Sequence, residues 1–89
     1  MRLLNAPAVV TLTSDGNPQA VAWQHPHHGT RHAARPRRVI TVIDTWRYDG
    51  RWWEERELHR DHYLLELDGG VQAEIFREND AWWVARITD

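Results

Sequence analysis

Short turn signals recur along this 89-residue chain and separate stretches that are rich in β-branched and aromatic residues. They lie at residues 14–18, 49–50, 68–70 and 78–80. Glycine, asparagine and aspartate favour turns because they accept positive φ or bond to their own backbone, whereas β-branched and aromatic side chains pack well on a pleated sheet. The pattern predicts an all-β protein: a small antiparallel meander of about six strands that could curl into a partly open barrel.

The most distinctive turn signal is Asp49-Gly50, within a tryptophan-rich stretch at residues 44–55. Asp-Gly is typical of a two-residue type I′ hairpin turn, in which both central residues need positive φ. Taking it as the turn gives three cross-strand pairs: Tyr48 with Arg51, Arg47 with Trp52, and Trp46 with Trp53. Each face of this hairpin would then bring a guanidinium next to an aromatic ring, which is a favourable contact.

The signal at Asp68-Gly69-Gly70 allows a test of strand register. A two-residue loop would place Leu65 and Leu67 on the face of polar residues, whereas a three-residue loop keeps one face apolar. The three-residue loop is therefore expected, with Gly70 in the left-handed position of a bulged turn. It predicts three pairs: Leu67 with Val71, Leu65 with Ala73, and Tyr63 with Ile75.

Two further hairpins are expected, formed by residues 8–13 with 19–23 and by residues 71–76 with 81–87. In the second, the register leaves open whether Trp82 or Trp83 faces the interior. The run Val39–Ile43 is apolar on both faces, as in a central strand covered on both sides. Residues 54–62 could form a helical turn, although they are too polar for an amphipathic helix.

Tryptophan is the main large side chain available to fill a core, because the chain has six tryptophans but one phenylalanine and one methionine. We assign Trp23, Trp46 and one of the neighbours Trp82 and Trp83 to the interior. An exposed ring is then expected at Trp52 or Trp53.

Residues 1–89 are expected to form a single β-domain with an irregular, histidine-rich loop at 24–36. The loop holds four histidines, of which His28 and His32 have helical spacing, but Gly29 argues against a helix. The chain has no cysteine, and no carboxylate lies nearby to complete a zinc site. We therefore expect no metal and no cofactor. The lack of cysteine and of a membrane-spanning apolar run indicates a cytoplasmic protein without membrane contact.

All 11 basic residues are arginine, which suits stacking and bidentate contacts, although a codon bias would give the same composition. Six of them lie from Arg31 to Arg51, whereas residues 52–89 hold ten acidic residues against four arginines, and the net charge of the chain is −2. A general nucleic-acid binder is not indicated. Local binding of a single strand stays an alternative, through exposed tryptophan with Arg37, Arg38, Arg47 and Arg51.

The best cluster for acid–base chemistry is His59-Arg60-Asp61-His62. On a strand, alternation would put His59 and Asp61 on one face and His62 on the other, which divides the group. The chain also has no glycine-rich phosphate loop and no Gly-x-Ser-x-Gly motif. We therefore expect that the protein is not an enzyme.

The second half of the chain carries five motifs in a fixed order. They are Asp44-Thr45-Trp46-Arg47, Trp52-Trp53-Glu54, Arg60-Asp61-His62-Tyr63-Leu64-Leu65, Gly69-Gly70 and a closing Trp82-Trp83-Val84-Ala85-Arg86-Ile87-Thr88-Asp89. It resembles a bacterial domain of unknown function that occurs alone and is similar to the C-terminus of ImuB-type, Y-family-polymerase-like proteins. The resemblance covers residues 44–89. It departs from the family at Thr88, where tyrosine is common, and in the histidine-rich loop.

The resemblance implies an accessory role in DNA repair or damage-tolerant DNA synthesis, through partners and not through catalysis. We expect a protein-interaction module, with nucleic-acid binding or a homodimer as alternatives. The predicted binding residues are Trp52, Trp53, Arg47, Arg51, Tyr48, Arg37 and Arg38.

Overall fold

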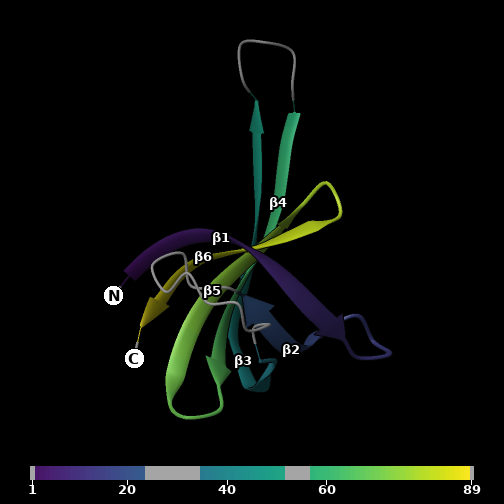
Figure 1. The fold of residues 1–89 in the computed structure, drawn as a ribbon. Coiled ribbons are helices and arrows are strands. Elements are labelled where there is room, and N and C mark those ends of the chain that lie inside the picture. Colours follow the sequence, from purple (N-terminus) through teal and green to yellow (C-terminus); the bar gives the residue numbers. More distant parts are fainter. Residues whose placement is uncertain (1, 24–34, 52–56, 89) are drawn as a thin grey trace.

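The structure, a computed structural model, describes residues 2–23, 35–51 and 57–88, with the backbone alone at residues 2–4, 51, 57 and 58. This part of the chain forms six strands: β1 (Arg2–Leu12), β2 (Pro18–Trp23), β3 (Arg37–Arg51), β4 (Glu57–Leu67), β5 (Val71–Glu78) and β6 (Ala81–Thr88). Each strand pairs antiparallel with the next, and β1 pairs with β6, which closes the meander into a barrel (Figure 1). The predicted all-β meander is confirmed.

The core lies inside the barrel and is made mainly of aliphatic side chains. Its largest fully buried members are Val21, Leu65, Leu67, Ile75 and Val84. Alternation along each strand places these residues on one face, so the barrel interior is apolar throughout. Trp23 and Trp82 are half-buried and pack against this cluster, as expected for Trp23 and for one of the two neighbouring tryptophans.

The turn between β4 and β5 has the predicted register, with Leu67 opposite Val71 and a three-residue connection. Gly70 has a φ of 78°, so it occupies the left-handed conformation expected of it. Arg37 closes the turn from β3: its Nε donates to Asp68 Oδ1 at 3.1 Å, and a terminal nitrogen donates to the Asp68 carbonyl. This arginine therefore has a structural role at the base of the barrel.

The turn between β5 and β6 is made by Asn79 and Asp80, which both have positive φ, as a type I′ turn requires. Its register places Phe76 opposite Trp83, and a bulge follows between Glu74 and Ile75. Trp82 faces the core, whereas Trp83 stacks with Phe76 on the outside of the barrel. This resolves the ambiguity that the sequence left open.

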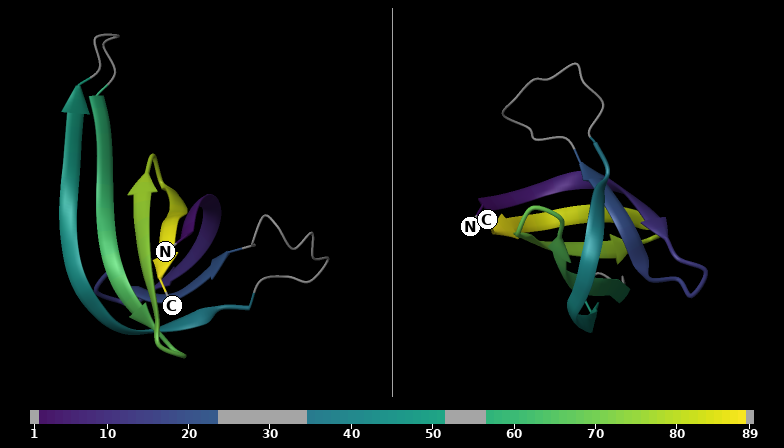
Figure 2. Two further views of the ribbon diagram at one scale, coloured as in Figure 1. Left: turned by 90° about the vertical axis from the view of Figure 1, so that its left-hand side faces the viewer. Right: turned by 90° about the horizontal axis from the view of Figure 1, so that it is seen from below.

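β3 is the longest strand, and together with the first half of β4 it rises beyond the barrel as a ribbon, defined here as residues 46–51 and 57–62 (Figure 2). Residues 61 and 62 also pair with β5, so the ribbon is two-stranded from the Tyr48–Arg60 pair outward. The predicted Asp49-Gly50 turn is wrong, because both residues lie inside β3, opposite His59 and Leu58. Gly50 is not among the glycines with positive φ. Instead, the ring of Tyr48 covers it, with Cε1 2.6 Å from where a β-carbon would lie.

The cross-strand pairs predicted around Asp49-Gly50 are wrong as well, because β3 pairs with β4 in a different register. Trp46 lies opposite His62, Arg47 opposite Asp61 and Tyr48 opposite Arg60. Eight consecutive pairs run from Asp44–Leu64 to Arg51–Glu57, and this long ladder outweighs the local preference of Asp-Gly for a turn. The helical turn considered for 54–62 is wrong in its described part, since 57–62 belongs to β4. The predicted partners Trp52 and Trp53 lie outside the described residues.

The prediction that Val39–Ile43 is a doubly covered strand is also wrong. β2 pairs with β3 only at Arg37 and Arg38, so beyond them β3 has one strand partner, β4, in the part of the chain that the structure describes. Register shifts leave Ile40 and Ile43 without an opposite residue. Bulges of this kind turn neighbouring side chains outward, and both isoleucines are exposed. Trp46 is exposed as well, which contradicts its assignment to the core.

Candidate protein-interaction surface

Exposed apolar side chains gather on one strand of this molecule. Among the described residues, five of the seven large hydrophobic side chains that are exposed belong to β3, and they are 38–51% exposed. We call these five the β3 strip: Ile40, Val42, Ile43, Trp46 and Tyr48. The other two, Val9 and Leu12, are on β1. Isolated exposed hydrophobic residues are common on protein surfaces, but a run along one strand edge is typical of an interaction site.

One face of the ribbon is aromatic. The Trp46 ring stacks on His62, with centroids 5.2 Å apart and planes 8° apart. His62 in turn contacts Phe76 at 5.3 Å, and Phe76 stacks with Trp83 at 6.5 Å. These four side chains therefore form a row across β3, β4, β5 and β6 on the outside of the barrel, which we call the aromatic row. The row begins at an exposed indole, Trp46, on the free edge of β3.

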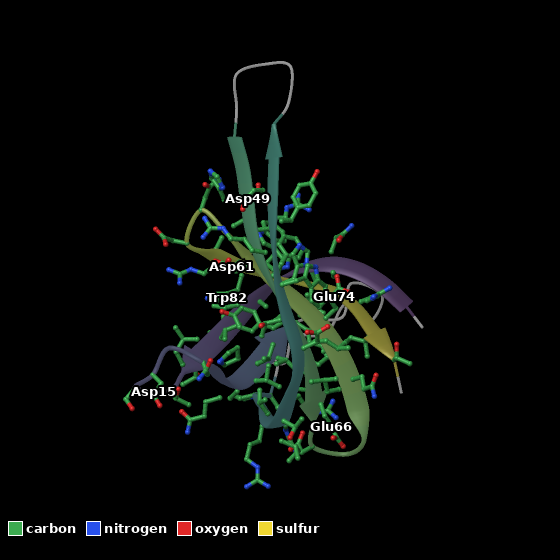
Figure 3. All side chains as sticks on the ribbon, turned by 180° about the vertical axis from the view of Figure 1, so that it is seen from behind. Asp15, Asp49, Asp61, Glu66, Glu74 and Trp82 are labelled. Carbon is green, nitrogen blue, oxygen red and sulfur yellow. The ribbon has the colours of Figure 1, made fainter. Side chains whose placement is uncertain are left out.

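The other face of the ribbon is charged. Asp49 Oδ1 accepts from Arg47 Nε at 3.0 Å and from His59 Nδ1 at 2.6 Å. Asp61 Oδ1 lies 4.0 Å from the same Arg47 nitrogen, and Asp49 and Asp61 lie along the same part of the ribbon (Figure 3). The hydrogen bond from His59, followed by the contact with Arg47, holds the pKa of Asp49 below its ordinary value.

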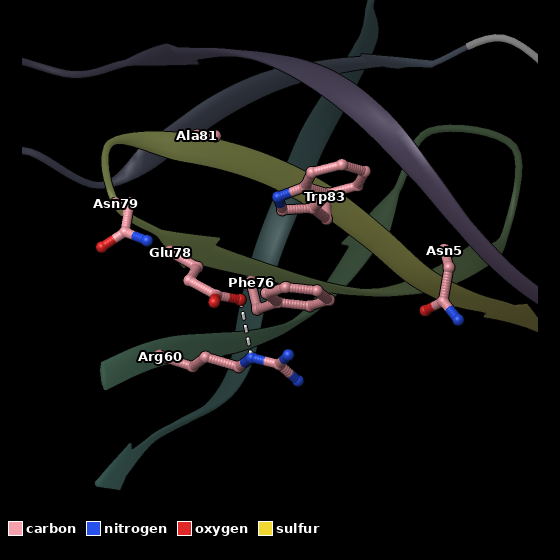
Figure 4. Close-up of a pocket in the computed structure, with 7 residues that line it drawn as sticks. All are labelled: Asn5, Arg60, Phe76, Glu78, Asn79, Ala81 and Trp83. Carbon is pink, nitrogen blue, oxygen red and sulfur yellow. Dashed lines mark hydrogen bonds and ion pairs between the residues drawn. The ribbon is translucent and has the colours of Figure 1, made fainter. Parts of the chain in front are cut away.

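A shallow pocket of about 460 Å³ lies beside the aromatic row (Figure 4). Phe76 and Trp83 supply its rings, and the Arg60 guanidinium lies 4.7 Å from the Phe76 centroid. Arg60 Nε also donates to Glu78 Oε2 at 2.9 Å. Asn5, on the opposite wall, has a φ of 46° at the bulge between Leu3 and Ala6 in β1. The pocket is apolar at its rings and polar at its rim, which suits a side chain or small group that has both characters.

Beside the row, Glu74 Oε1 forms an ion pair with a terminal nitrogen of Arg86, at a distance of 2.7 Å. His62 Nδ1 lies 3.5 Å from the same carboxylate, within ion-pair range but not aligned for a hydrogen bond. Both Glu74 and His62 are mostly buried. The Glu74 carboxylate therefore lies between the Arg86 guanidinium and the imidazole on which Trp46 stacks.

Carboxylates pair with five of the seven arginines whose side chains the structure describes, Arg35 and Arg38 being the exceptions. Five arginines each lie within 3.1 Å of a carboxylate oxygen: Arg37 with Asp68, Arg47 with Asp49, Arg60 with Glu78, Arg77 with Asp80 and Arg86 with Glu74. A guanidinium whose charge is matched in this way gains little from a phosphate, because the phosphate must compete with an existing partner.

The predicted binding residues fall into two separate places. Arg37 and Arg38 are at the barrel end of β3, whereas Arg47 and Tyr48 are about ten residues further along, which in an extended strand is roughly 33 Å. Only the backbone of Arg51 is described, and Trp52 and Trp53 lie outside the described residues. The structure therefore does not join these arginines into one site.

The sequence reasoning missed the aromatic row and the aliphatic half of the β3 strip. The three-residue loop already implied that His62 lies opposite Phe76, so that part of the row could have been found from register alone. The exposure of Ile40, Val42 and Ile43 could not, because it depends on where β2 stops pairing.

Within the described residues, no group of three or more histidine, aspartate or glutamate side chains is arranged to hold a metal ion. His59 and Asp61 lie on the charged face and His62 on the aromatic face, the division that strand alternation predicted. No helix in the described ranges is long and apolar enough to cross a membrane. No family model, curated protein or solved structure shows a significant match to this chain.

Proposed function

We propose that this protein is a non-enzymatic, cytoplasmic interaction module that binds another protein chain through the β3 strip. The observation that carries the proposal is the concentration of exposed apolar and aromatic side chains on the free edge of one strand. Tyrosine and tryptophan are the residues that most often anchor protein interfaces, because they bury a large area at low entropic cost. The resemblance to ImuB-type C-termini suggests that the partner acts in DNA repair or damage-tolerant DNA synthesis.

The pairing of the arginines favours a protein partner over a nucleic acid. Single strands bind through bases stacked on rings and phosphates bound to free cations, and binding of that kind weakens steeply with salt. The aromatic row offers rings, but the arginine beside it, Arg60, is already bound to Glu78. We therefore expect only weak binding to a labelled single-stranded oligonucleotide, which fluorescence anisotropy at low and high salt can measure.

The test compares two double variants as baits in an extract of the source cell. Trp46→Ser with Tyr48→Ser removes the rings of the β3 strip, and Val9→Ser with Leu12→Ser removes the two exposed hydrophobic side chains of β1. We expect specific proteins to be retained by the wild type and by the β1 variant and lost from the β3 variant. Equal retention by all three baits would exclude the β3 strip as the binding surface.

A further inference from the structure

Beyond the Trp46–His62 and Arg47–Asp61 pairs, the ribbon lacks a third strand among the described residues. From the Tyr48–Arg60 pair outward, β3 pairs only with β4, and neither strand has another neighbour in the described ranges. An isolated two-stranded ribbon is marginally stable in water, and its free edge carries unpaired backbone N–H and C=O groups that can pair with another strand. A strand added along β3 would satisfy these groups and cover the exposed rings.

We propose that a second copy of this chain supplies that strand. The two β3 strands would pair antiparallel over residues 45–51 about a two-fold axis at Tyr48, which joins the ribbons into one four-stranded sheet. The proposal names a partner for the β3 strip, so it rests on the proposed function.

The charges of the strand and the length of the paired segment together favour this register. A two-fold axis between two neighbouring antiparallel strands is perpendicular to the sheet, so side chains on one face of the first copy meet side chains on the same face of the second. The axis must therefore lie midway between one residue and the same residue of the second copy, and it is named here by that residue. An axis at Tyr48 places Arg47 opposite Asp49 of the second copy, and it does so twice. An axis at Arg47 or at Asp49 would oppose identical charges, and an axis at Thr45 or at Trp46 forms no opposite-charge pair. An axis at Gly50 would oppose Asp49 and Arg51, but it pairs only residues 49–51 of the described part of β3, against seven residues for the axis at Tyr48.

The aromatic face fits the same register. An axis at Tyr48 places Trp46 opposite Gly50 of the second copy, which has no side chain of its own. The Tyr48 ring already leans over its own Gly50, so Trp46 would pack against the Tyr48 ring of the second copy. The aromatic row, which begins at Trp46 on the free edge, would then continue across the dimer.

The size of the interface sets the expected strength. Seven paired residues bury less surface than a standard protein interface, so the dimer should be weak and depend on concentration. Sedimentation equilibrium from about 10 μM to about 1 mM should show the mass rising from one chain toward two. A mass of one chain over this whole range would overturn the proposal.

Two charge variants test the register. Arg47→Asp makes residues 47 and 49 both acidic, and Asp49→Arg makes both basic, so each variant should raise its own dimer dissociation constant about tenfold or more. Mixing the two should restore association as a one-to-one heterodimer, because acid then faces base at every pair. Each substitution also removes the contact within one chain, but mixing cannot repair that contact, so recovery on mixing reports only on contacts between copies.

A matched control pair is formed by Arg77, near the end of β5, and Asp80, in the turn that follows it. β4 separates this pair from β3. Arg77→Asp and Asp80→Arg make the same charge changes at an exposed ion pair away from the edge of β3. Each control variant should therefore keep the dimer dissociation constant of the wild type, and mixing the two should produce no added association. Failure of the β3 variants to combine, or equal effects from the control pair, would exclude the register. The proposed function fails on a separate result, the retention of extract proteins by the Trp46→Ser, Tyr48→Ser bait.

Discussion

Asp49 is the residue whose ionisation the ribbon depends on most clearly. The hydrogen bond from His59 has the largest effect and lowers the pKa of Asp49. Partial desolvation opposes it, but the hydrogen bond and charge of Arg47 lower the pKa further, so in the folded protein it lies below its unfolded value. The stabilisation is therefore fully present above the unfolded pKa of about 3.9 and is lost as the pH falls through the lower folded pKa. NMR titration of the side-chain carboxyl should show the lowered pKa, and His59→Gln should move it upward. An unchanged titration in His59→Gln would mean that another group causes the shift.

Leu65 and Ile43 show how differently two aliphatic residues of this fold contribute to stability. Leu65 is fully buried among the core residues, so Leu65→Ala should lower the free energy of unfolding by about 2–5 kcal/mol. Ile43 occupies a bulge and is exposed, so Ile43→Ala should cost about 0.5 kcal/mol or less at a protein concentration that keeps the chain monomeric. Urea unfolding measures both values, and similar losses would contradict the assignment of Ile43 to the surface.

At the level of elements, alanine substitutions at two glycines should show that Gly70 lies in a turn and Gly50 in a strand. Gly70 has positive φ in open space, so Gly70→Ala adds only backbone strain, about 1–2 kcal/mol. Gly50 lies in a strand, where alanine is favoured, but its new β-carbon must displace the Tyr48 ring. We expect Gly50→Ala to stay within about 1 kcal/mol of the wild type while shifting the Tyr48 ring resonances. A larger loss than that of Gly70→Ala, with the Tyr48 ring resonances unchanged, would contradict the placement of Gly50 in a strand.

The elements that sequence reasoning predicted correctly are those whose register depends on nearby residues. Leu65 and Leu67 have polar neighbours on the opposite face, so alternation alone selected the loop between β4 and β5. The prediction of a turn at Asp49-Gly50 was wrong because turn preference is local, whereas the stack of Trp46 on His62 joins residues sixteen positions apart. The prediction that Ile40 is covered was wrong for a similar reason, since its exposure depends on where a different strand, β2, stops pairing with β3.

At the scale of the whole molecule, the barrel and the ribbon should open independently, because the fully buried side chains lie in the barrel while the ribbon carries exposed rings and ion pairs. Local opening then requires less free energy than global unfolding, so at about 20 μM the amides of Tyr48 and Arg60 should exchange with deuterium about 100-fold faster than those of Leu65, Ile75 and Val84. Raising the concentration to about 1 mM should slow exchange in the ribbon but not in the barrel, since pairing with a second copy protects only the ribbon. Hydrogen exchange followed by NMR measures both effects, with Arg47→Asp as the control that should lose the concentration dependence. Ribbon amides as slow as core amides in dilute solution would instead show one cooperative unit, in which the ribbon needs no third strand.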